Sequence, residues 1–333
     1  MYGGLNNING TTCAINTLIQ IITHSKRLYD ALHSSYTYTY DANNQEVNKL
    51  VWHLTFITEA LANSNSVTPG GLVSLLYDLF PDNFVRGEQM DIYELWVLIA
   101  NRITDEVGVN KTYNILHPKH INSDISSKVQ ENINKINNGK YSTWLENIQS
   151  IQLGVLKCLN PSCGDTPWNA EVFNSFEVDI PLNHDPQKPI VIDQLLLKNH
   201  VIEEFLEWKC DKCNSKGGIK QSQIYTLPHV LMIMIKRFRM TANGTFKKIN
   251  TPINISNNIN FQLNGISTNY NLIGIGNHYG VYGGGHYTAH VLENNNWICF
   301  DDIHRSVIDI SKHNIFVNNN SVYILCYELI TIC

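Results

Sequence analysis

Cys13 stands where a polar, glycine-containing loop meets a stretch with the apolar spacing of a helix. A thiol at a helix N-terminus lies at the positive end of the helix dipole and near unpaired backbone N–H groups. Both favour the reactive thiolate, and the same N–H groups can hold a developing oxyanion. The position therefore predicts a nucleophile. Taken alone, the segment fits a buried structural cysteine at a helix start somewhat better.

A candidate general base for Cys13 is His286, which follows three consecutive glycines at 283–285. Glycine permits close backbone approach, which suits a narrow channel beside a reacting group. The chain then reads as two short strands joined by a polar turn at 293–296, and Asp301 ends the second strand. Such a hairpin returns this carboxylate to the imidazole, where it can fix the tautomer. Without Cys13, the segment would read as a surface histidine in a glycine loop.

The residues around Cys13 resemble the Cys box of the ubiquitin-specific protease family, in which Gly-Leu-x-Asn is followed by Gly-x-Thr-Cys-x-x-Asn-x-x-x-Gln. The matching residues are Gly4, Leu5, Asn7, Gly10, Thr12, Cys13, Asn16 and Gln20. The loop between Asn7 and Gly10 is one residue longer than the family pattern. In the family an asparagine of this loop donates a hydrogen bond to the oxyanion. The resemblance implies that role for Asn7 or Asn9 and leaves the choice open.

Residues 283–302 resemble the His box of the same family, which reads Gly-Gly-His-Tyr-x-Ala, then a tryptophan, an aromatic residue and Asp-Asp. The resemblance implies that His286 is the general base and Asp301 the third member of the triad. It places Asp302 at a neighbouring polar position that helps with the oxyanion or the triad in some members.

Three further segments agree with the family in its own order. His278 lies in a stretch like the family's His-x-Gly, which implies a structural or substrate-lining role. Residues 89–95 resemble a Gln-x-Asp-x-x-Glu box, and residues 227–238 resemble a Leu-Pro-x-x-Leu strand that ends in Lys-Arg-Phe. The resemblance therefore covers nearly the whole chain.

Four of the eight cysteines form two close pairs. Four residues separate Cys158 from Cys163, and two separate Cys210 from Cys213. Two such pairs have the layout of a four-cysteine Zn²⁺ ribbon, which is structural because four thiolates leave no open position. The family often carries this site in its fingers, with two residues inside the first pair where this chain has four. Free thiols at a lost site are the alternative reading.

The order of the elements predicts an α+β protein. Apolar residues at helical spacing predict helices at 13–28, 47–62, 72–80 and from Asp91 onward, where Asp91 and Glu94 have capping-box spacing. The polar stretch 110–139 predicts a surface loop with short helical pieces. β-Branched and aromatic residues predict strands at 151–157, 175–180, 225–238, 270–277, 287–292, 297–301 and 322–327.

The resemblance implies one catalytic domain over residues 1–333 with a papain-like cysteine peptidase fold. In this reading, residues of about 1–149 form a helical thumb and 226–333 a β-rich palm. Residues 150–225 form fingers with a zinc ribbon.

The composition is that of a folded protein, with 43% hydrophobic and 16% charged residues and a formal net charge of -5. The sequence has no dense stripe of lysine and arginine, so we do not expect a nucleic-acid partner. The first residues lack the features of a signal peptide, and no apolar run is long enough for a membrane span. We therefore expect a cytoplasmic protein, with the nucleus left open, that has reduced thiols and is a monomer.

The predicted function is a deubiquitinating cysteine protease that hydrolyses the (iso)peptide bond after the C-terminal glycine of ubiquitin. The alternatives are a ubiquitin-binding pseudoprotease, a protease for another ubiquitin-like modifier and a papain-like peptidase for ordinary peptides. A zinc scaffold without catalysis would leave the Cys box and the glycines before His286 unexplained. The residues do not decide the modifier, the chain linkage or the modified target.

Overall fold

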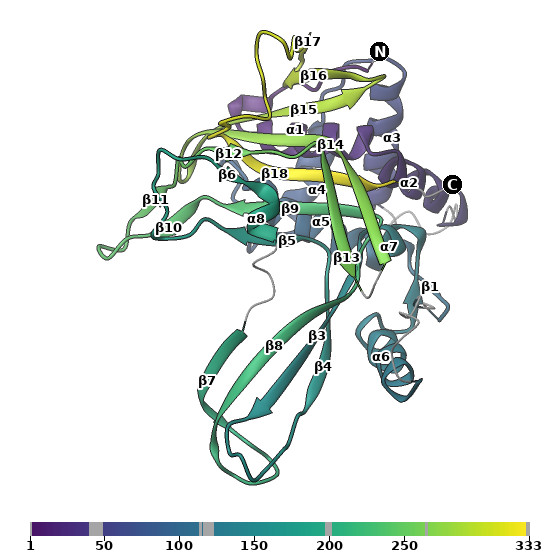
Figure 1. Ribbon diagram of the computed structural model, residues 1–333. Coiled ribbons are helices and arrows are strands. Elements are labelled where there is room, and N and C mark those ends of the chain that lie inside the picture. Colours follow the sequence, from purple (N-terminus) through teal and green to yellow (C-terminus); the bar gives the residue numbers. More distant parts are fainter. Residues whose placement is uncertain are drawn as a thin grey trace.

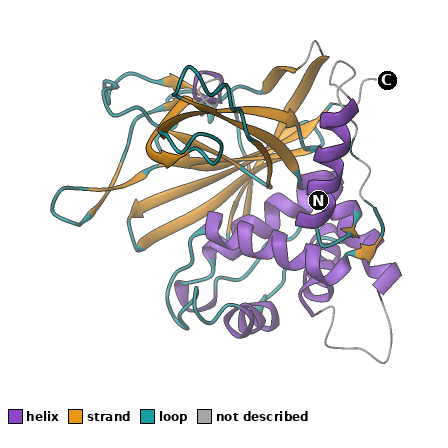
Figure 2. Ribbon diagram, turned by 90° about the horizontal axis from the view of Figure 1, so that it is seen from below, coloured by secondary structure: helices purple, strands orange, loops and turns teal. Residues whose placement is uncertain are grey.

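Helices come first along the chain and most strands follow, in a computed structural model that describes residues 2–39, 49–112, 115, 123–196, 202–263 and 266–330. The helices are η1 (Ile8–Gly10), α1 (Cys13–His24), α2 (Lys26–Thr39), α3 (Lys49–Ala62), α4 (Gly70–Leu79), α5 (Ile92–Val107), α6 (Ser123–Ile136), α7 (Thr143–Ile148) and α8 (Ile192–Leu196). Most of them gather beside one large sheet (Figure 1, Figure 2). The predicted α+β class is confirmed. No helix among these residues is long and apolar enough to cross a bilayer.

The large sheet collects strands from the second half of the chain. Its order is β17 (His304–Val307), β16 (Asn296–Asp301), β15 (Gly284–Glu293), β14 (Ile266–Val281), β18 (Val322–Leu329), β9 (Val230–Lys236) and β5 (Phe176–Asp179), and β13 (Asn258–Leu263) pairs with β14 beside this path. Only β5 and β9 run parallel within it. The predicted 225–238 strand is interrupted at Pro228, which has no N–H to donate to a ladder.

A second sheet projects away from the helices and the large sheet (Figure 1). Its order is β4 (Trp168–Phe173), β3 (Ser150–Cys158), β8 (Lys216–Thr226) and β7 (Ile202–Lys209). Small pairs are formed by β1 (Val109–Asn110) with β2 (Lys140–Tyr141), β10 (Phe238–Met240) with β11 (Phe246–Lys248), and β6 (Ile190–Val191) with β12 (Ile253–Asn254). Within the stretch predicted as fingers, β5 belongs to the large sheet instead, so that stretch contributes to both sheets.

Helix α1 is buried on every side rather than along one stripe. All its residues from Cys13 to Thr23 are buried, as expected of a helix enclosed by a protein core. A Cβ added to Gly276 of β14 would come 3.4 Å from Thr17 of α1 and 2.5 Å from Ile324 of the neighbouring strand β18. Helix α1 therefore lies directly against the large sheet. Its buried polar side chains are partly satisfied: Gln20 Nε2 donates to Gly3 O at 2.9 Å, while Gln20 Oε1 has no partner among the described residues. The fold therefore places Cys13 at the end of its most enclosed helix.

The predicted 13–28 helix is two helices, because Ser25 breaks it. Its extended ψ of 107° ends α1, and its hydroxyl both donates to Glu328 at 2.5 Å and accepts from the Leu28 N–H at 3.2 Å. Serine in this role offers the backbone a local alternative to a continuing helix. The apolar period continues across the break, so periodicity alone could not find it.

Two other segments differ from their predicted extents. The 110–139 stretch, predicted as a loop with short helical pieces, contains the fourteen-residue helix α6. Val129 and Ile133 of α6 are buried against Ile151 and Tyr225, a contact that its polar sequence hides. The first two residues of the predicted 47–62 helix lie outside the described residues.

Candidate active site and cysteine cluster

The loop before α1 is tied to the helix start, so that Cys13 begins the helix as predicted. Thr12 is the N-cap residue. Asn7 Oδ1 accepts a hydrogen bond from the Thr12 backbone N–H at 2.9 Å, and the Thr12 hydroxyl accepts one from the Ile8 N–H at 2.9 Å. Asn9 has a φ of 52°, a left-handed conformation that asparagine tolerates better than most residues.

His286 and Asp301 meet across the predicted hairpin. Strands β15 and β16 pair with Ala289 opposite Phe300, and this register returns Asp301 to His286. The distance from His286 Nε2 to Asp301 Oδ1 is 2.6 Å. With Nε2–H donating to the carboxylate, Nδ1 is left as the ring nitrogen that can accept a proton. Gly285 is required beside them, since a Cβ there would lie 2.3 Å from Tyr279 O.

Cys13 and His286 come from opposite ends of the chain and lie in neighbouring elements. The backbone N–H of Tyr287, the residue after the histidine, lies near enough to the Cys13 thiol to lower its pKa. The side chain of Cys13 is 0% exposed. No hydrogen bond joins the Cys13 sulfur to the His286 ring among the contacts of the described residues. The structure therefore brings the elements of the predicted nucleophile and the predicted base together without a hydrogen bond between the two side chains.

The helix start lowers the pKa of Cys13 as predicted, but the net shift of that pKa is upward. Burial raises the pKa of the thiol above its usual value. Hydrogen bonds from the backbone N–H groups of Tyr287, Ala14 and Cys13 itself lower the pKa, and the negative charge of Asp302 raises it. Removing the sulfur from water outweighs the helix terminus, because desolvation penalises the charged form.

Asp302 follows Asp301 but binds different groups. Its carboxylate accepts hydrogen bonds from Asn7 Nδ2 at 2.9 Å and from Asn16 Nδ2 at 2.8 Å. Asn16 lies one turn after Cys13 in α1 and is buried. Through these two amides, the loop before α1 and α1 itself are both joined to the residue that follows β16. Sequence reasoning matched Asn16 to the Cys box but did not assign it a role, although its spacing from Cys13 places it on the same side of the helix.

Asn7 and Asn9, which the sequence left equivalent, have different surroundings. Asn7 is half-buried and held at both ends of its amide, by Thr12 and by Asp302. Asn9 is exposed, and its side chain makes no hydrogen bond among the described residues. Asn7 is therefore the preorganised group of the two.

Asp91 connects α5 to the strand that carries the base. Its Oδ1 caps the helix by accepting from the N–H groups of Tyr93 at 2.8 Å and Glu94 at 3.1 Å. Its Oδ2 accepts from the hydroxyl groups of Tyr323 at 2.7 Å and Tyr287 at 3.4 Å. The predicted capping box is only half formed, because the Glu94 carboxylate binds the side-chain amide of a neighbouring loop residue instead.

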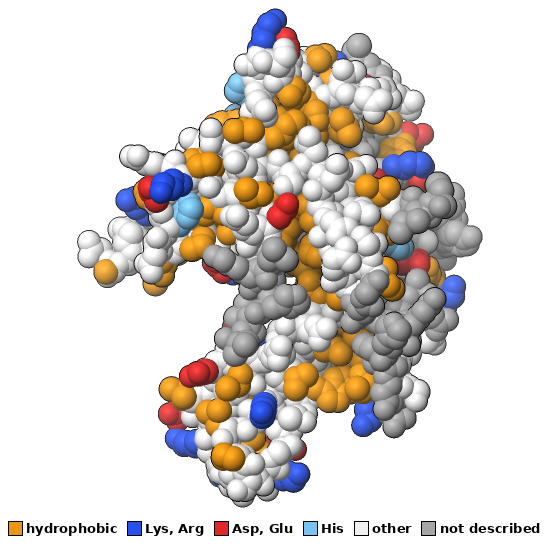
Figure 3. All heavy atoms as spheres, in the orientation of Figure 1, with side chains coloured by type: hydrophobic (Ala, Val, Ile, Leu, Met, Phe, Trp, Pro, Cys, Tyr) orange, Lys and Arg blue, Asp and Glu red, His pale blue; other side chains and the backbone are white. Residues whose placement is uncertain are grey.

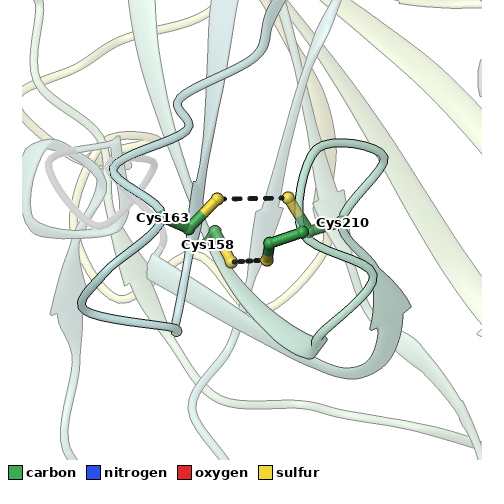
Figure 4. Close-up of side chains that lie close together, drawn as sticks. Cys158, Cys163 and Cys210 are labelled. Carbon is green, nitrogen blue, oxygen red and sulfur yellow. Dashed lines mark hydrogen bonds between the residues drawn. The ribbon is translucent and has the colours of Figure 1, made fainter.

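The four paired cysteines converge at the far end of the projecting sheet (Figure 4). Their sulfur atoms lie within 4.8 Å of one another, with 3.7 Å between Cys158 and Cys213 and between Cys163 and Cys210. These thiols are free, and the distances far exceed a disulfide bond. The cluster can hold a metal ion. The longer first pair is accommodated by a turn in which the Cys163 N–H donates to Asn160 O at 3.0 Å.

A cavity of about 820 Å³ lies between α5 and the base of the projecting sheet. Tyr93 and Asn101 line it from α5, and Phe173, Glu177 and Lys220 line it from the strands. None of the predicted catalytic residues lines it. The surface is also hollowed between the β10–β11 hairpin and the projecting sheet (Figure 3).

A cysteine at the start of a buried helix that packs against the strand of a histidine–aspartate pair is consistent with a papain-like cysteine peptidase. A family model described as ubiquitin carboxyl-terminal hydrolase matches residues 3–327, and the chain belongs to that family.

Curated relatives and solved structures agree with this assignment. A probable ubiquitin carboxyl-terminal hydrolase of Schizosaccharomyces pombe is 25% identical over 98% of this chain and 58% of its own length. One of Acanthamoeba polyphaga mimivirus is 30% identical over 51% of this chain and 38% of its own length. The chain thus spans less than two thirds of the length of each of these two relatives.

Two solved structures share the fold. A chain from a structure of the yeast SAGA DUB module has a TM-score of 0.71 at 21% identity, over 100% of this chain and 69% of that one. A chain from the SAGA DUB module bound to monoubiquitin has the same TM-score and identity, over 99% and 70%. The family expected from the sequence motifs is confirmed.

Proposed function

We propose that this protein is a deubiquitinating cysteine protease that hydrolyses the (iso)peptide bond after the C-terminal glycine of ubiquitin. The observation that carries the proposal is the placement of Cys13 at the start of α1, beside strand β15 with its His286–Asp301 pair. The names of the curated relatives and the monoubiquitin-bound complex support ubiquitin as the modifier.

Catalysis begins when the His286 ring approaches the Cys13 sulfur. Nδ1 takes the thiol proton, and the thiolate attacks the carbonyl carbon of the terminal glycine. The imidazolium then protonates the leaving lysine amine as the C–N bond breaks, and a thioester remains. Water, deprotonated by His286, releases the carboxylate and returns the thiol. Asp301 holds the ring in the required tautomer and stabilises its charge.

The raised pKa of Cys13 is consistent with the absence of a hydrogen bond between its sulfur and the His286 ring among the described contacts. A thiol without a cationic neighbour stays protonated in a buried site. Catalytic hydrogen bonds are often long in a free enzyme and tighten when substrate binds. We propose that substrate entry brings the imidazole closer to the sulfur, so that the ion pair is a minor species in the free chain and the major one in the complex.

Asn7 is the proposed side-chain donor to the oxyanion. One N–H of its amide donates to Asp302, and its oxygen accepts from Thr12, so the orientation of the group is fixed before substrate arrives. The second N–H of the same nitrogen remains for the substrate. Donors that are fixed in advance stabilise charge without a reorganisation cost. The N–H of Cys13 itself supplies a backbone donor at the same place.

The direct test uses ubiquitin with an electrophile at its C-terminus. The native protein should form a covalent adduct through Cys13, and Cys13→Ala should bind ubiquitin without forming it. Cys299→Ser is the matched control, because Cys299 is a half-buried thiol on β16 with no proposed role. Hydrolysis of a fluorogenic ubiquitin C-terminal amide should follow the same pattern. Equal labelling of Cys13→Ala and the native chain would refute the proposal.

A ubiquitin-binding pseudoprotease is the second candidate, favoured by the burial of the Cys13 thiol and by its lack of a hydrogen bond to His286 among the described contacts. Binding of ubiquitin without adduct formation by the native chain would establish it. A panel of electrophilic probes built on other ubiquitin-like modifiers separates the third possibility, a protease for a relative of ubiquitin.

We also propose that the cysteine cluster binds one structural Zn²⁺ ion. Tetrahedral Zn²⁺ with Zn–S bonds of about 2.3 Å requires sulfur atoms roughly 3.8 Å apart. The 3.7 Å separations of Cys158–Cys213 and Cys163–Cys210 fit this requirement. Hydrogen bonds from Ser215 lower the pKa of Cys213 to about 6, whereas burial raises the pKa of Cys163 to about 12, so Cys213 is the readier thiolate of the two. The ion would join the two turns at the end of the projecting sheet.

The arrangement of the layers supports the division into thumb, fingers and palm, with one change. Residues 176–179 form an edge strand of the large sheet, and we assign them to the palm rather than to the fingers. The projecting sheet, with the cysteine cluster at its far end, then forms the fingers.

A further inference from the structure

The side chain of Gln89 touches both halves of the candidate active site. Its Oε1 accepts a hydrogen bond from the Gly285 backbone N–H at 2.8 Å, and its Nε2 donates to the Gly285 carbonyl at 2.8 Å. The same Nε2 donates to Gly10 O at 3.3 Å. Gly285 precedes His286, and Gly10 lies in the loop that leads to Cys13. One amide thus joins the backbone beside the base to the backbone beside the nucleophile.

An amide is suited to this position because it presents a donor and an acceptor side by side. The pair formed with Gly285 repeats the way a neighbouring strand would bind, N–H to oxygen in both directions. Only the backbone of Gly285 is available for these hydrogen bonds, since a side chain at this position would collide with Tyr279 O and with the ring of His278. The peptide before His286 is therefore held from the α5 side of the site by Gln89.

The residue on the other side of the base is held from the same segment. Asp91, two residues after Gln89, accepts hydrogen bonds from the hydroxyl groups of Tyr287 and Tyr323. The residues on either side of His286 are thus both held by the segment that leads into α5: Gly285 by Gln89, and Tyr287 by Asp91. The side chain of His286 itself is 38% exposed and is anchored only by Asp301 among the described contacts.

We propose that Gln89 is a positioning residue for the hydrolysis proposed above: its amide fixes the backbone of His286 at the distance from the Cys13 loop that proton transfer requires. The inference rests on the proposed function for its catalytic consequence. Gln89 is itself exposed, so its hydrogen bonds compete with water and contribute little to folding. Their value lies in geometry, because small displacements of a catalytic group are costly to rate.

The test compares Gln89→Ala and Gln89→Glu with the native chain. Gln89→Ala should lower kcat by about 10- to 100-fold. KM should change by less than about twofold, because the contact does not involve the modifier. Gln89→Glu keeps the shape and the acceptor for Gly285 N–H but loses the donor, and it should not restore kcat. Its carboxylate should also move the acid limb of the kcat/KM pH profile to higher pH, since a negative charge favours the imidazolium.

Glu88→Ala is the matched control, because Glu88 is the exposed neighbour of Gln89 and its side chain makes no hydrogen bond among the described residues. It should retain the native kcat. Ubiquitin affinity, measured by calorimetry in a Cys13→Ala background, should be unchanged by Gln89→Ala. A native kcat in Gln89→Ala, a loss expressed only in KM, or native kinetics in Gln89→Glu would overturn the proposal.

A second measurement does not depend on deubiquitination. The rate of Cys13 alkylation by iodoacetamide, followed by mass spectrometry across pH, reports how His286 assists the thiol. Gln89→Ala should lose the same neutral-pH component of that rate that His286→Ala loses. If the native chain hydrolyses no ubiquitin substrate, the proposed function fails while this comparison still decides the role of Gln89. Alkylation of Gln89→Ala that matches the native profile would reject the positioning role.

Discussion

Asn7 and Asn9, which lie in the loop that precedes α1, allow a sharp test of the oxyanion assignment. We compare Asn7→Ala with Asn9→Gly. Glycine is the correct replacement at position 9, because its φ of 52° would strain an alanine. Asn9→Gly therefore removes the amide without disturbing the backbone. Asn7→Ala removes a group that Thr12 and Asp302 hold in place.

The magnitudes follow from the contacts. Loss of an oxyanion donor costs about 10²- to 10³-fold in kcat, so Asn7→Ala should fall by this factor with KM little changed. It also leaves the Thr12 N–H unpaired and removes a hydrogen bond to a carboxylate, which together lower the free energy of unfolding by about 2–4 kcal/mol. Asn9→Gly should keep kcat within about twofold and stability within about 0.5 kcal/mol, since its side chain is exposed and unbonded.

The assay is steady-state hydrolysis of a fluorogenic ubiquitin C-terminal amide, with urea unfolding of the same preparations. Measuring well below the unfolding transition of Asn7→Ala separates its catalytic loss from unfolding. A large loss of kcat in Asn9→Gly with a near-native Asn7→Ala would refute the assignment. Equal losses in both variants would show that the loop acts through its backbone and not through Asn7.

Three further predictions concern the rest of the molecule. Asp301→Asn should lower kcat by about 10²- to 10⁴-fold with little change in ubiquitin affinity, because the His286 ring loses the carboxylate that fixes its tautomer; an unchanged kcat would exclude Asp301 from the triad. Burial lowers the pKa of His24 and of His290 to about 4, below the 6.5 of an unfolded chain, so the unfolded state binds protons first as pH falls. Stability should decline between about pH 6.5 and 4, by up to roughly 3 kcal/mol for each histidine, and urea unfolding at pH 7.5 and 5 that gives equal values would contradict this. The purified chain should hold one Zn²⁺ by elemental analysis, and Cys213→Ser or a strong chelator should lower the melting temperature; a metal-free native protein with the same melting temperature as Cys213→Ser would reject the zinc site.

Features encoded over short stretches could be predicted from the sequence. The start of a helix at Cys13 follows from a polar loop that precedes an apolar period, and the structure has it there. The return of Asp301 to His286 follows from two short strands and a polar turn, and the 2.6 Å contact agrees. The convergence of two cysteine pairs required one further assumption, that metal-ligand spacing indicates spatial proximity.

Features that depend on three-dimensional surroundings could not be predicted. The raised pKa of Cys13 arises from the enclosure of α1 by the large sheet and the other helices, which no local pattern records. The break at Ser25 depends on Glu328, a residue from the last strand. The role of Gln89 depends on Gly285 and is invisible until the α5 segment is placed against β15.

Asp301 and Asp302 show how adjacent identical residues acquire different functions. Asp302 has a φ of 53°, and this left-handed residue directs its carboxylate to Asn7 and Asn16 while Asp301 binds His286. Carboxylate oxygens of both residues lie within 4.8 Å of the imidazole and of each other, an arrangement that mutual repulsion opposes. The two amides offset that repulsion for Asp302, as the imidazole does for Asp301. Asp302, which holds the proposed oxyanion donor, and Asp301, which orients the proposed base, are therefore each stabilised by the group that they position. The contacts that offset the repulsion between the two carboxylates are the same contacts that preorganise the site.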